Sequence, residues 1–251
     1  FATIIRAIAE GRRIYQNMQR FLLYYWVCLA GSAIVVLIAL VVRDPSGRSA
    51  APLSTLQMIL IYICITPPAG ALSIQAASKT VMMEPPRPPT ESLFNKEILL
   101  DTFFYSLATA SICAIAFFIP LYTVNGYGVQ GVNCDSHYQV GLCDTLYRAR
   151  GSMLVTYLLA SLVTMPHCRS YRSFEWFSID GLKKTFKTRT WLGTFIFIII
   201  TLVLFLYIPV VAIKGFGQQK ITWEWGLDIA LVLLYIVFGD LYKLCKRKYL
   251  K

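Results

Sequence analysis

The chain has 251 residues, of which 57% are hydrophobic and only 15% are charged. Soluble domains usually carry about a quarter of charged residues, so this composition, with a mean hydropathy of +0.58, excludes an ordinary soluble domain and indicates a membrane protein. The net charge of +11 would suit nucleic-acid binding. The charges fall in short segments between long apolar stretches, however, where membrane topology explains them, and we expect no nucleic-acid partner.

Residues 1–20 predict an amphipathic helix that precedes the membrane. Apolar residues such as Ile4, Ile8 and Met18 recur at helical spacing, with basic residues between them. No helix breaker occurs before residue 42, so the helix should run directly into the first span as a cytoplasmic stalk. Because Phe1 already starts this pattern without an initiator methionine, we expect a fragment of a longer protein.

The membrane domain is expected over residues 21–251. Apolar stretches approach or exceed the roughly 20 residues needed to cross a bilayer, and segments rich in proline, glycine and charge separate them. The fold class predicted is an all-α membrane protein with six transmembrane helices and a stalk on the first. The predicted spans cover residues 21–42, 56–77, 98–122, 152–166, 191–213 and 223–242.

The distribution of basic residues predicts the orientation. With six spans, 18 of the Lys and Arg residues fall on the side of the two termini and 6 on the other side. Basic residues are enriched in cytoplasmic segments. Both termini are therefore expected in the cytoplasm.

Two of the seven cysteines lie in the loop assigned to the outside. Cys134 and Cys143 share the one compartment here that permits a disulfide, and they are nine positions apart, a loop that closes easily. We predict a disulfide between them. The remaining cysteines lie in spans or on the cytoplasmic side, and no cysteine–histidine cluster indicates a metal site.

The second span contains adjacent prolines, Pro67 and Pro68, directly after Thr66. Prolines remove amide donors, so carbonyls at residues 63–65 lose helical partners. Such carbonyls survive in a bilayer only inside protein or along a cavity, and broken helices commonly bind cations in transporters. We predict that the helix is unwound here and contributes to a cation site. The alternative is a kink that only shapes packing.

Carboxylates inside a membrane are functional by default, but few occur here. Glu97, Asp101 and Asp240 lie near the ends of predicted spans, where each can reach headgroups or a basic neighbour, so we interpret them as interfacial. Asp228 lies about a turn and a half into the sixth span and is harder to explain in this way. The middles of the first, second and fourth spans contain no carboxylate.

Several segments resemble P-type cation ATPases. The opening FATIIRAIAEGRRIYQNM resembles the stalk of their fifth transmembrane helix, and Pro68-Ala69 with the later MEPPRPP resembles their sixth helix and the loop after it. The segments RDPSGRS, CD…CD…YRAR and EWGL are similar to the fungal sodium-exporting (ENA-type) branch. The resemblance extends from residue 1 to residue 251 and implies that the six spans are helices five to ten of a ten-helix pump.

The resemblance also implies where a cation would bind. Such pumps take ligands from their fifth, sixth and eighth helices, and the corresponding positions here include Ser32 and the region of Ile65 and Thr66. Cys64 joins the candidate site as a polar neighbour in the segment expected to unwind. Hydroxyls and carbonyls can hold a dehydrated monovalent cation, whereas a divalent ion wants carboxylates. The candidate site therefore favours Na⁺ or K⁺ over Ca²⁺.

The phosphorylated Asp-Lys-Thr-Gly and magnesium-holding Gly-Asp-Gly motifs of these pumps do not occur in the chain. The resemblance thus implies the membrane transport half of a sodium/potassium efflux ATPase of the plasma membrane, with no cofactor of its own. Mg²⁺ and ATP are expected only for the intact pump with the missing N-terminal half. The alternative is a truncated, catalytically inactive scaffold that transports nothing. A lipid-modifying enzyme would need His, Asp or Glu clustered at one membrane face, and the sequence indicates none.

Overall fold

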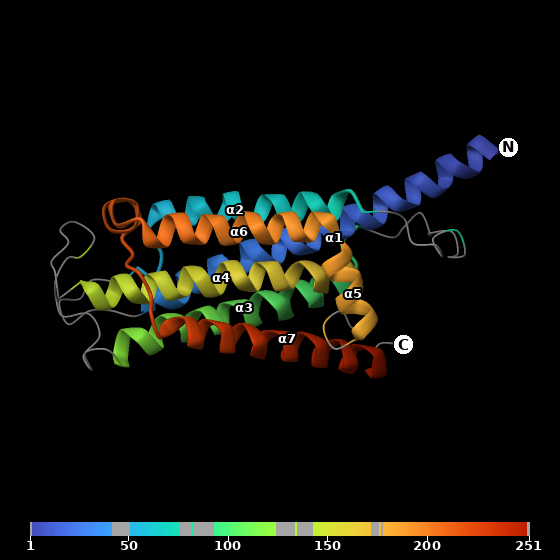
Figure 1. Ribbon diagram of the computed structural model, residues 1–251. Helices are drawn as coiled ribbons and strands as arrows, with labels where there is room; N and C mark the ends of the chain where they lie inside the picture. The colour runs from blue at the N-terminus through green and yellow to red at the C-terminus, as the bar shows by residue number, and fades with distance from the viewer. Residues whose placement is uncertain are drawn as a thin grey trace.

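The structure, a computed structural model, is an all-helical bundle (Figure 1). It describes residues 2–41, 51–75, 93–123, 143–171 and 178–249, together with residues 82, 134 and 176. No strand occurs within these ranges. The helices are α1 (Ala2–Val41), α2 (Thr55–Ser73), α3 (Lys96–Thr123), α4 (Asp144–Arg169), α5 (Ile179–Lys187), α6 (Arg189–Tyr207), the π-helix η1 (Val210–Phe216) and α7 (Glu224–Tyr249).

The stalk and the first span form one uninterrupted helix of 40 residues, α1. Its first turns project beyond the bundle (Figure 1) and leave Ile4 and Ile8 exposed. Asn17 is the first residue of α1 described as buried, and its side-chain amide donates to the main-chain carbonyl of Gln75 at 2.8 Å. This bond ties the base of the stalk to the chain that follows α2.

Five helices are long and apolar enough to cross a membrane: α1, α2, α3, α4 and α6. The remaining long helix, α7, packs against α3 and α4 in the same bundle. Its exposed face is apolar and includes Leu233, Val237 and Phe238, whereas Asp228 and Asp240 are buried on its other face. An apolar outer face with polar groups turned inward suits contact with lipid, so α7 has the features expected of the sixth predicted span.

The central helix is α4, which is buried along almost its whole length and contacts α1, α2, α3, α6 and α7. It begins at Asp144, eight residues before the predicted start of the fourth span, because its first turns are also packed against protein. Arg150, only 1% exposed, donates to the carbonyl of Ala51 at 2.9 Å. Arg148 and Arg150, which precede the predicted span, therefore lie on the helix.

The predicted span over residues 191–213 is two helices. Pro209 has no amide hydrogen for the carbonyl of Phe205, four residues earlier, and α6 ends at Tyr207 before η1 begins. The side chain of Gln218 replaces the missing donor at 2.9 Å from that carbonyl. Gln57, in the first turn of α2, donates in turn to Gln218 at 2.6 Å. A buried amide pair thus supports the break.

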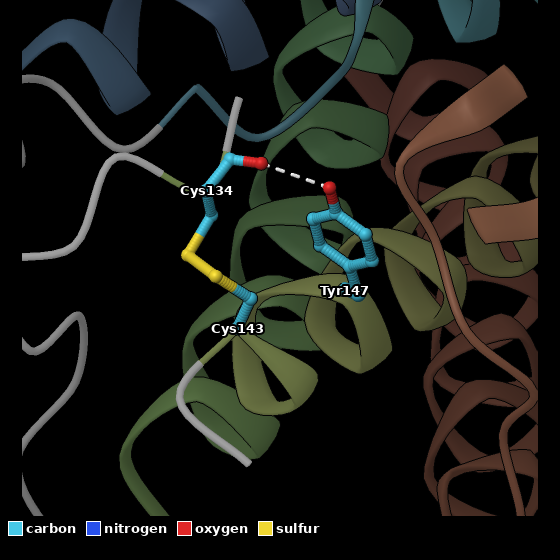
Figure 2. Close-up of a disulfide and its surroundings, with 3 residues drawn as sticks. All are labelled: Cys134, Cys143 and Tyr147. Carbon is cyan, nitrogen blue, oxygen red and sulfur yellow. Dashed lines mark hydrogen bonds between the residues drawn. A yellow bond between two sulfur atoms is a disulfide. The ribbon is translucent and has the colours of Figure 1, made fainter. Parts of the chain in front are cut away.

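The predicted disulfide is confirmed. Cys134 and Cys143 are bonded, with their Cα atoms 5.6 Å apart. The Tyr147 hydroxyl, one turn into α4, donates to the carbonyl of Cys134 at 2.8 Å (Figure 2). The disulfide precedes α4 at one end of the bundle, and the start of α1 and the end of α7 are both directed toward the opposite end (Figure 1), as expected for an even number of spans.

Candidate cation site

The α1 part of the candidate site is buried and rich in neutral oxygen atoms. Ser32 is 1% exposed, and its hydroxyl donates to the carbonyl of Leu29 at 2.8 Å. One turn earlier, the carbonyl of Cys28 accepts a 2.6 Å hydrogen bond from the hydroxyl of Tyr157 on α4. Tyr157 lies 125 residues after Ser32, and no local pattern in the sequence indicated that it would meet α1.

The side chains of the three candidate residues of α2 do not all point into the bundle. Cys64 and Ile65 are fully buried in the bundle, and Thr201 of α6 interacts with the Cys64 thiol. Thr66 is exposed, and its hydroxyl donates to the carbonyl of Tyr62, one turn back in the same helix, at 2.8 Å. The interior of the bundle therefore holds Ser32, Cys64 and Ile65, and the side chain of Thr66 points out of it.

The prediction that α2 unwinds at the prolines is wrong. The helix continues from Thr55 to Ser73 with Pro67 and Pro68 inside it. Proline already has a helical φ, and a transmembrane helix tolerates it where neighbouring groups satisfy the freed backbone. The prolines still remove two donors, so the carbonyls of Ile63 and Cys64, four residues earlier, have no amide partner within the helix.

A second polar centre, absent from the predicted site, lies between α4 and α7. Asp228 is fully buried, and one of its carboxylate oxygens accepts from Ser152 at 2.5 Å and from Thr156 at 3.0 Å. The other oxygen, Oδ2, has no hydrogen-bond partner. The position of Asp228 in its span had set it apart, but the two hydroxyls lie more than 70 residues away on another helix.

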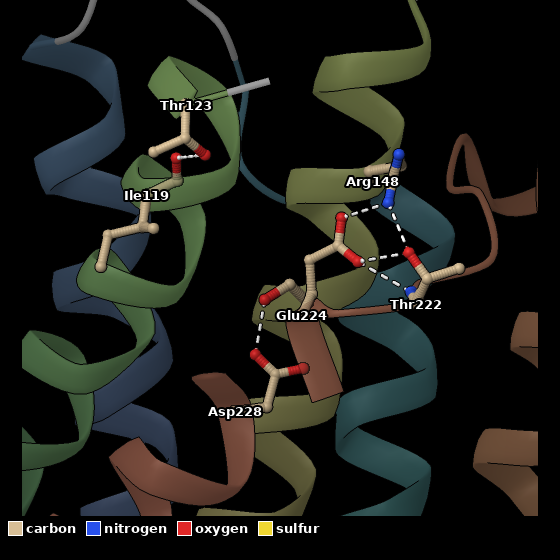
Figure 3. Close-up of polar contacts among 7 residues, drawn as sticks. Ile119, Thr123, Arg148, Thr222, Glu224 and Asp228 are labelled. Carbon is tan, nitrogen blue, oxygen red and sulfur yellow. Dashed lines mark hydrogen bonds and ion pairs between the residues drawn. The ribbon is translucent and has the colours of Figure 1, made fainter. Parts of the chain in front are cut away.

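One turn from Asp228 toward the disulfide end, Glu224 forms an ion pair. Its carboxylate lies 2.8 Å from the Arg148 guanidinium and accepts from the Thr222 main-chain amide at 2.7 Å (Figure 3). Arg148 also donates to the Thr222 hydroxyl at 2.7 Å. The guanidinium of Arg148 therefore compensates the charge of Glu224. Asp228, which lies below Glu224 in Figure 3, has hydroxyl partners in place of an ion pair.

At the opposite end of the bundle, two of the three carboxylates interpreted as interfacial are buried in protein, and the third, Glu97, is half-buried and lies 2.9 Å from the ammonium of Lys246. Asp101 is 2% exposed, lies 2.6 Å from the ammonium of Lys246, and accepts from the Tyr242 hydroxyl at 2.8 Å. Asp240 is 1% exposed and lies 3.6 Å from Nδ1 of His167. Their partners come from the protein rather than from headgroups. In the part of the chain that the structure describes, no three His, Cys, Asp or Glu residues are grouped as a metal site.

Comparison with known proteins identifies the membrane region that these helices form. Residues 50–245 match the family model described as cation transporting ATPase, C-terminus. The chain belongs to this family. The resemblance to P-type cation ATPases is thereby confirmed, and the chain corresponds to the C-terminal membrane part of such ATPases. The whole-length similarity to fungal sodium/potassium exporters confirms the resemblance to that branch.

The relatives include two fungal exporters. Over its whole length the chain is 32% identical to sodium/potassium exporting P-type ATPase 1 of Saccharomyces cerevisiae, and it covers 24% of that protein. It is 24% identical to sodium/potassium exporting P-type ATPase cta3 of Schizosaccharomyces pombe, over 98% of the chain and 25% of the relative. Calcium-transporting ATPase 1 of Bacillus cereus is 26% identical over 98% of the chain and 26% of the relative. The chain thus spans about a quarter of the length of these relatives.

Proposed function

We propose that the chain forms the cation pathway of a P-type ATPase that exports Na⁺ or K⁺. The observation that carries this proposal is the neutral, oxygen-lined interior between α1, α2 and α4. It holds the Ser32 hydroxyl, the Tyr157 hydroxyl and the Cys28 carbonyl. The similarity to fungal exporters over the whole chain supports it.

The chemistry of these groups favours a monovalent ion. The carbonyls of Ile63 and Cys64 lack amide partners within α2 because of the prolines, and Cys64 is fully buried. Carbonyl and hydroxyl oxygens replace the hydration shell of Na⁺ or K⁺ without adding charge, whereas Ca²⁺ sites depend on carboxylates. Ser32 and the α2 carbonyls are the proposed ligands, and Tyr157 positions α4 against them.

The intact pump is proposed to divide its tasks between two parts. An N-terminal part would bind ATP and Mg²⁺ and form the aspartyl-phosphate, and α1 would connect it to the site. The proposed location is the plasma membrane, with both termini in the cytoplasm and with lipid on the apolar faces of α6 and α7. A catalytically inactive membrane scaffold is the competing outcome.

A chimeric pump tests the proposal. The C-terminal quarter of the Saccharomyces cerevisiae exporter is replaced by this chain, and Na⁺-stimulated ATP hydrolysis is measured in membranes. We expect activity, and we expect Ser32→Ala to raise the half-saturating Na⁺ concentration about tenfold, the effect of losing one hydrogen-bonding group to a charge.

Ser106→Ala is the matched control. Ser106 is equally buried, on α3, and its hydroxyl donates to the carbonyl three residues earlier at 3.1 Å, as that of Ser32 does. The control should leave the Na⁺ dependence unchanged. A correctly inserted chimera with no stimulation by Na⁺ or K⁺ would support the scaffold instead, and equal effects of the two substitutions would remove Ser32 from the site.

A further inference from the structure

The carboxylate of Asp228 is the least compensated buried charge that the structure describes among the membrane helices. It is 0% exposed, and both of its hydrogen bonds come from hydroxyls of α4 and go to the same oxygen. Oδ2 is buried and has no partner. A carboxylate removed from water without a counter-charge costs several kcal/mol, so a site of this kind persists only if a proton or a cation neutralises it.

The groups around Asp228 do not supply that neutralisation. From α7, the acidic group one turn away is Glu224, and the nearby basic residue of α4, Arg148, is already paired with it at 2.8 Å and is not paired with Asp228. From α3, the buried thiol of Cys113 interacts electrostatically with Asp228. The groups that these helices place near Asp228 are therefore neutral, acidic, or, in the case of Arg148, already paired with Glu224.

We propose that Asp228, Ser152 and Thr156 form a second binding site for a monovalent cation, the proton included, between α4 and α7. The two hydroxyls hold one carboxylate oxygen in place and leave Oδ2 for the bound ion. A single carboxylate with two hydroxyls provides one negative charge, which matches H⁺, Na⁺ or K⁺ and falls short of the ligand set of Ca²⁺. The inference concerns binding by this chain itself and does not rest on the proposed pump activity.

Infrared difference spectroscopy on the chain in lipid nanodiscs tests this site. The protonated-carboxyl band of Asp228 is assigned by its loss in Asp228→Asn. Spectra are recorded at neutral and acidic pH in choline chloride, and again after addition of NaCl or KCl. Intact helix content and the intact Cys134–Cys143 disulfide verify folding in each sample.

We expect Asp228 to be protonated in choline chloride at neutral pH. A band that decreases when Na⁺ or K⁺ is added identifies a metal-cation site, and a band that responds only to pH identifies a proton site. Either result supports the inference. Asp228 that is ionised at neutral pH in choline and does not respond to Na⁺ or K⁺ would overturn it, since the carboxylate would then be stable without an ion.

A pair of hydroxyl-deletion variants keeps the test decisive if Asp228→Asn does not fold. Ser152→Ala with Thr156→Val removes both donors to the carboxylate, so the protonated fraction of Asp228 should rise and the concentration of Na⁺ that displaces the proton should increase about tenfold. Ser106→Ala with Thr194→Val is the control, because those hydroxyls donate to carbonyls of their own helices. Identical spectra for the two double variants would exclude Asp228 as the group that binds the ion.

Discussion

At the scale of single residues, the contact between Gly239 and His167 shows how tightly α7 packs on α4. A Cβ atom at Gly239 would lie 2.7 Å from Nε2 of His167. The imidazole is itself enclosed, since it is fully buried between Asp240 and the rings of Tyr105 and Tyr235. Neither helix can move aside cheaply, so glycine is required here by space rather than by backbone conformation.

Gly239→Ala should destabilise the protein by about 1–3 kcal/mol, the usual cost of overpacking a dense interior, despite the better helix propensity of alanine. The measurement is thermal unfolding of the purified chain in detergent. Gly226→Ala, in the same helix, is the control, because nothing lies within 4 Å of its added Cβ. That variant should be neutral or slightly more stable, and equal losses in the two variants would contradict the packing explanation.

At the scale of elements, the junction between α6 and α7 depends on side chains rather than on a helical hydrogen-bond ladder. The carbonyl of Phe205 is bonded by Gln218 because Pro209 cannot donate to it. Gln57 also serves the start of α2, where its side chain accepts from the Ser54 amide at 2.8 Å in a capping box. One network therefore supports the end of one helix and the start of another.

Gln218→Leu should destabilise the protein by about 2 kcal/mol or more, because the Phe205 carbonyl and the Gln57 amide both lose a buried partner. Chemical denaturation in detergent measures the loss. Gln219→Leu is the matched control at the next position, where the side-chain oxygen already has no hydrogen-bond partner. If Gln219→Leu costs as much as Gln218→Leu, the support for the Phe205 carbonyl is not what stabilises the junction.

Hydropathy was sufficient to predict the helical class and the continuous helix of stalk and first span, and the distribution of basic residues with the cysteine spacing was sufficient to predict the disulfide. These patterns failed where the outcome depends on which groups become neighbours. Pro209 was placed inside a continuous predicted span. The break at Pro209 depends on a hydrogen bond from Gln218 to the Phe205 carbonyl, and Gln218 lies outside the predicted span. Pro67 and Pro68 were read as a break, although packing on adjacent helices keeps α2 continuous.

The candidate site was predicted only in part for the same reason. The polar groups that face one another belong to different helices, as with Asp228 and Ser152, which are 76 residues apart. Spacing along one helix predicts which residues share a face, but it does not predict which helix covers that face. The family resemblance therefore indicated Ser32, and the position of a carboxylate within an apolar span indicated Asp228, but neither indicated the partners Tyr157 and Thr156.

At the scale of the whole molecule, the cysteines mark its two ends. Cys134 and Cys143 form the disulfide at the end of the bundle where α4 begins. Cys245, three residues beyond Tyr242 on α7, is the exposed free cysteine near the end where both termini lie, and the other four free cysteines are buried. The chain therefore carries a natural reporter on each side of the membrane.

A membrane-impermeant maleimide should not label Cys245 in sealed cells and should label it after permeabilisation, if the termini are cytoplasmic. Mild external reduction should expose Cys134 and Cys143 to the same reagent without permeabilisation. Cys245→Ser is the control that assigns the first signal. Labelling of Cys245 in sealed, unreduced cells would reverse the orientation inferred from the basic residues.

The continuity of α1 has a mechanical consequence. At 1.5 Å per residue, Asn17 lies about 22 Å from Ala2 and about 22 Å from Ser32. At Asn17 the helix enters the bundle and is hydrogen-bonded to the chain after α2. Asn17 therefore lies midway along α1 between the tip of the stalk and Ser32. If α1 pivoted as a rigid body at Asn17, a sideways displacement of the tip of the stalk would move Ser32 by about the same distance in the opposite direction.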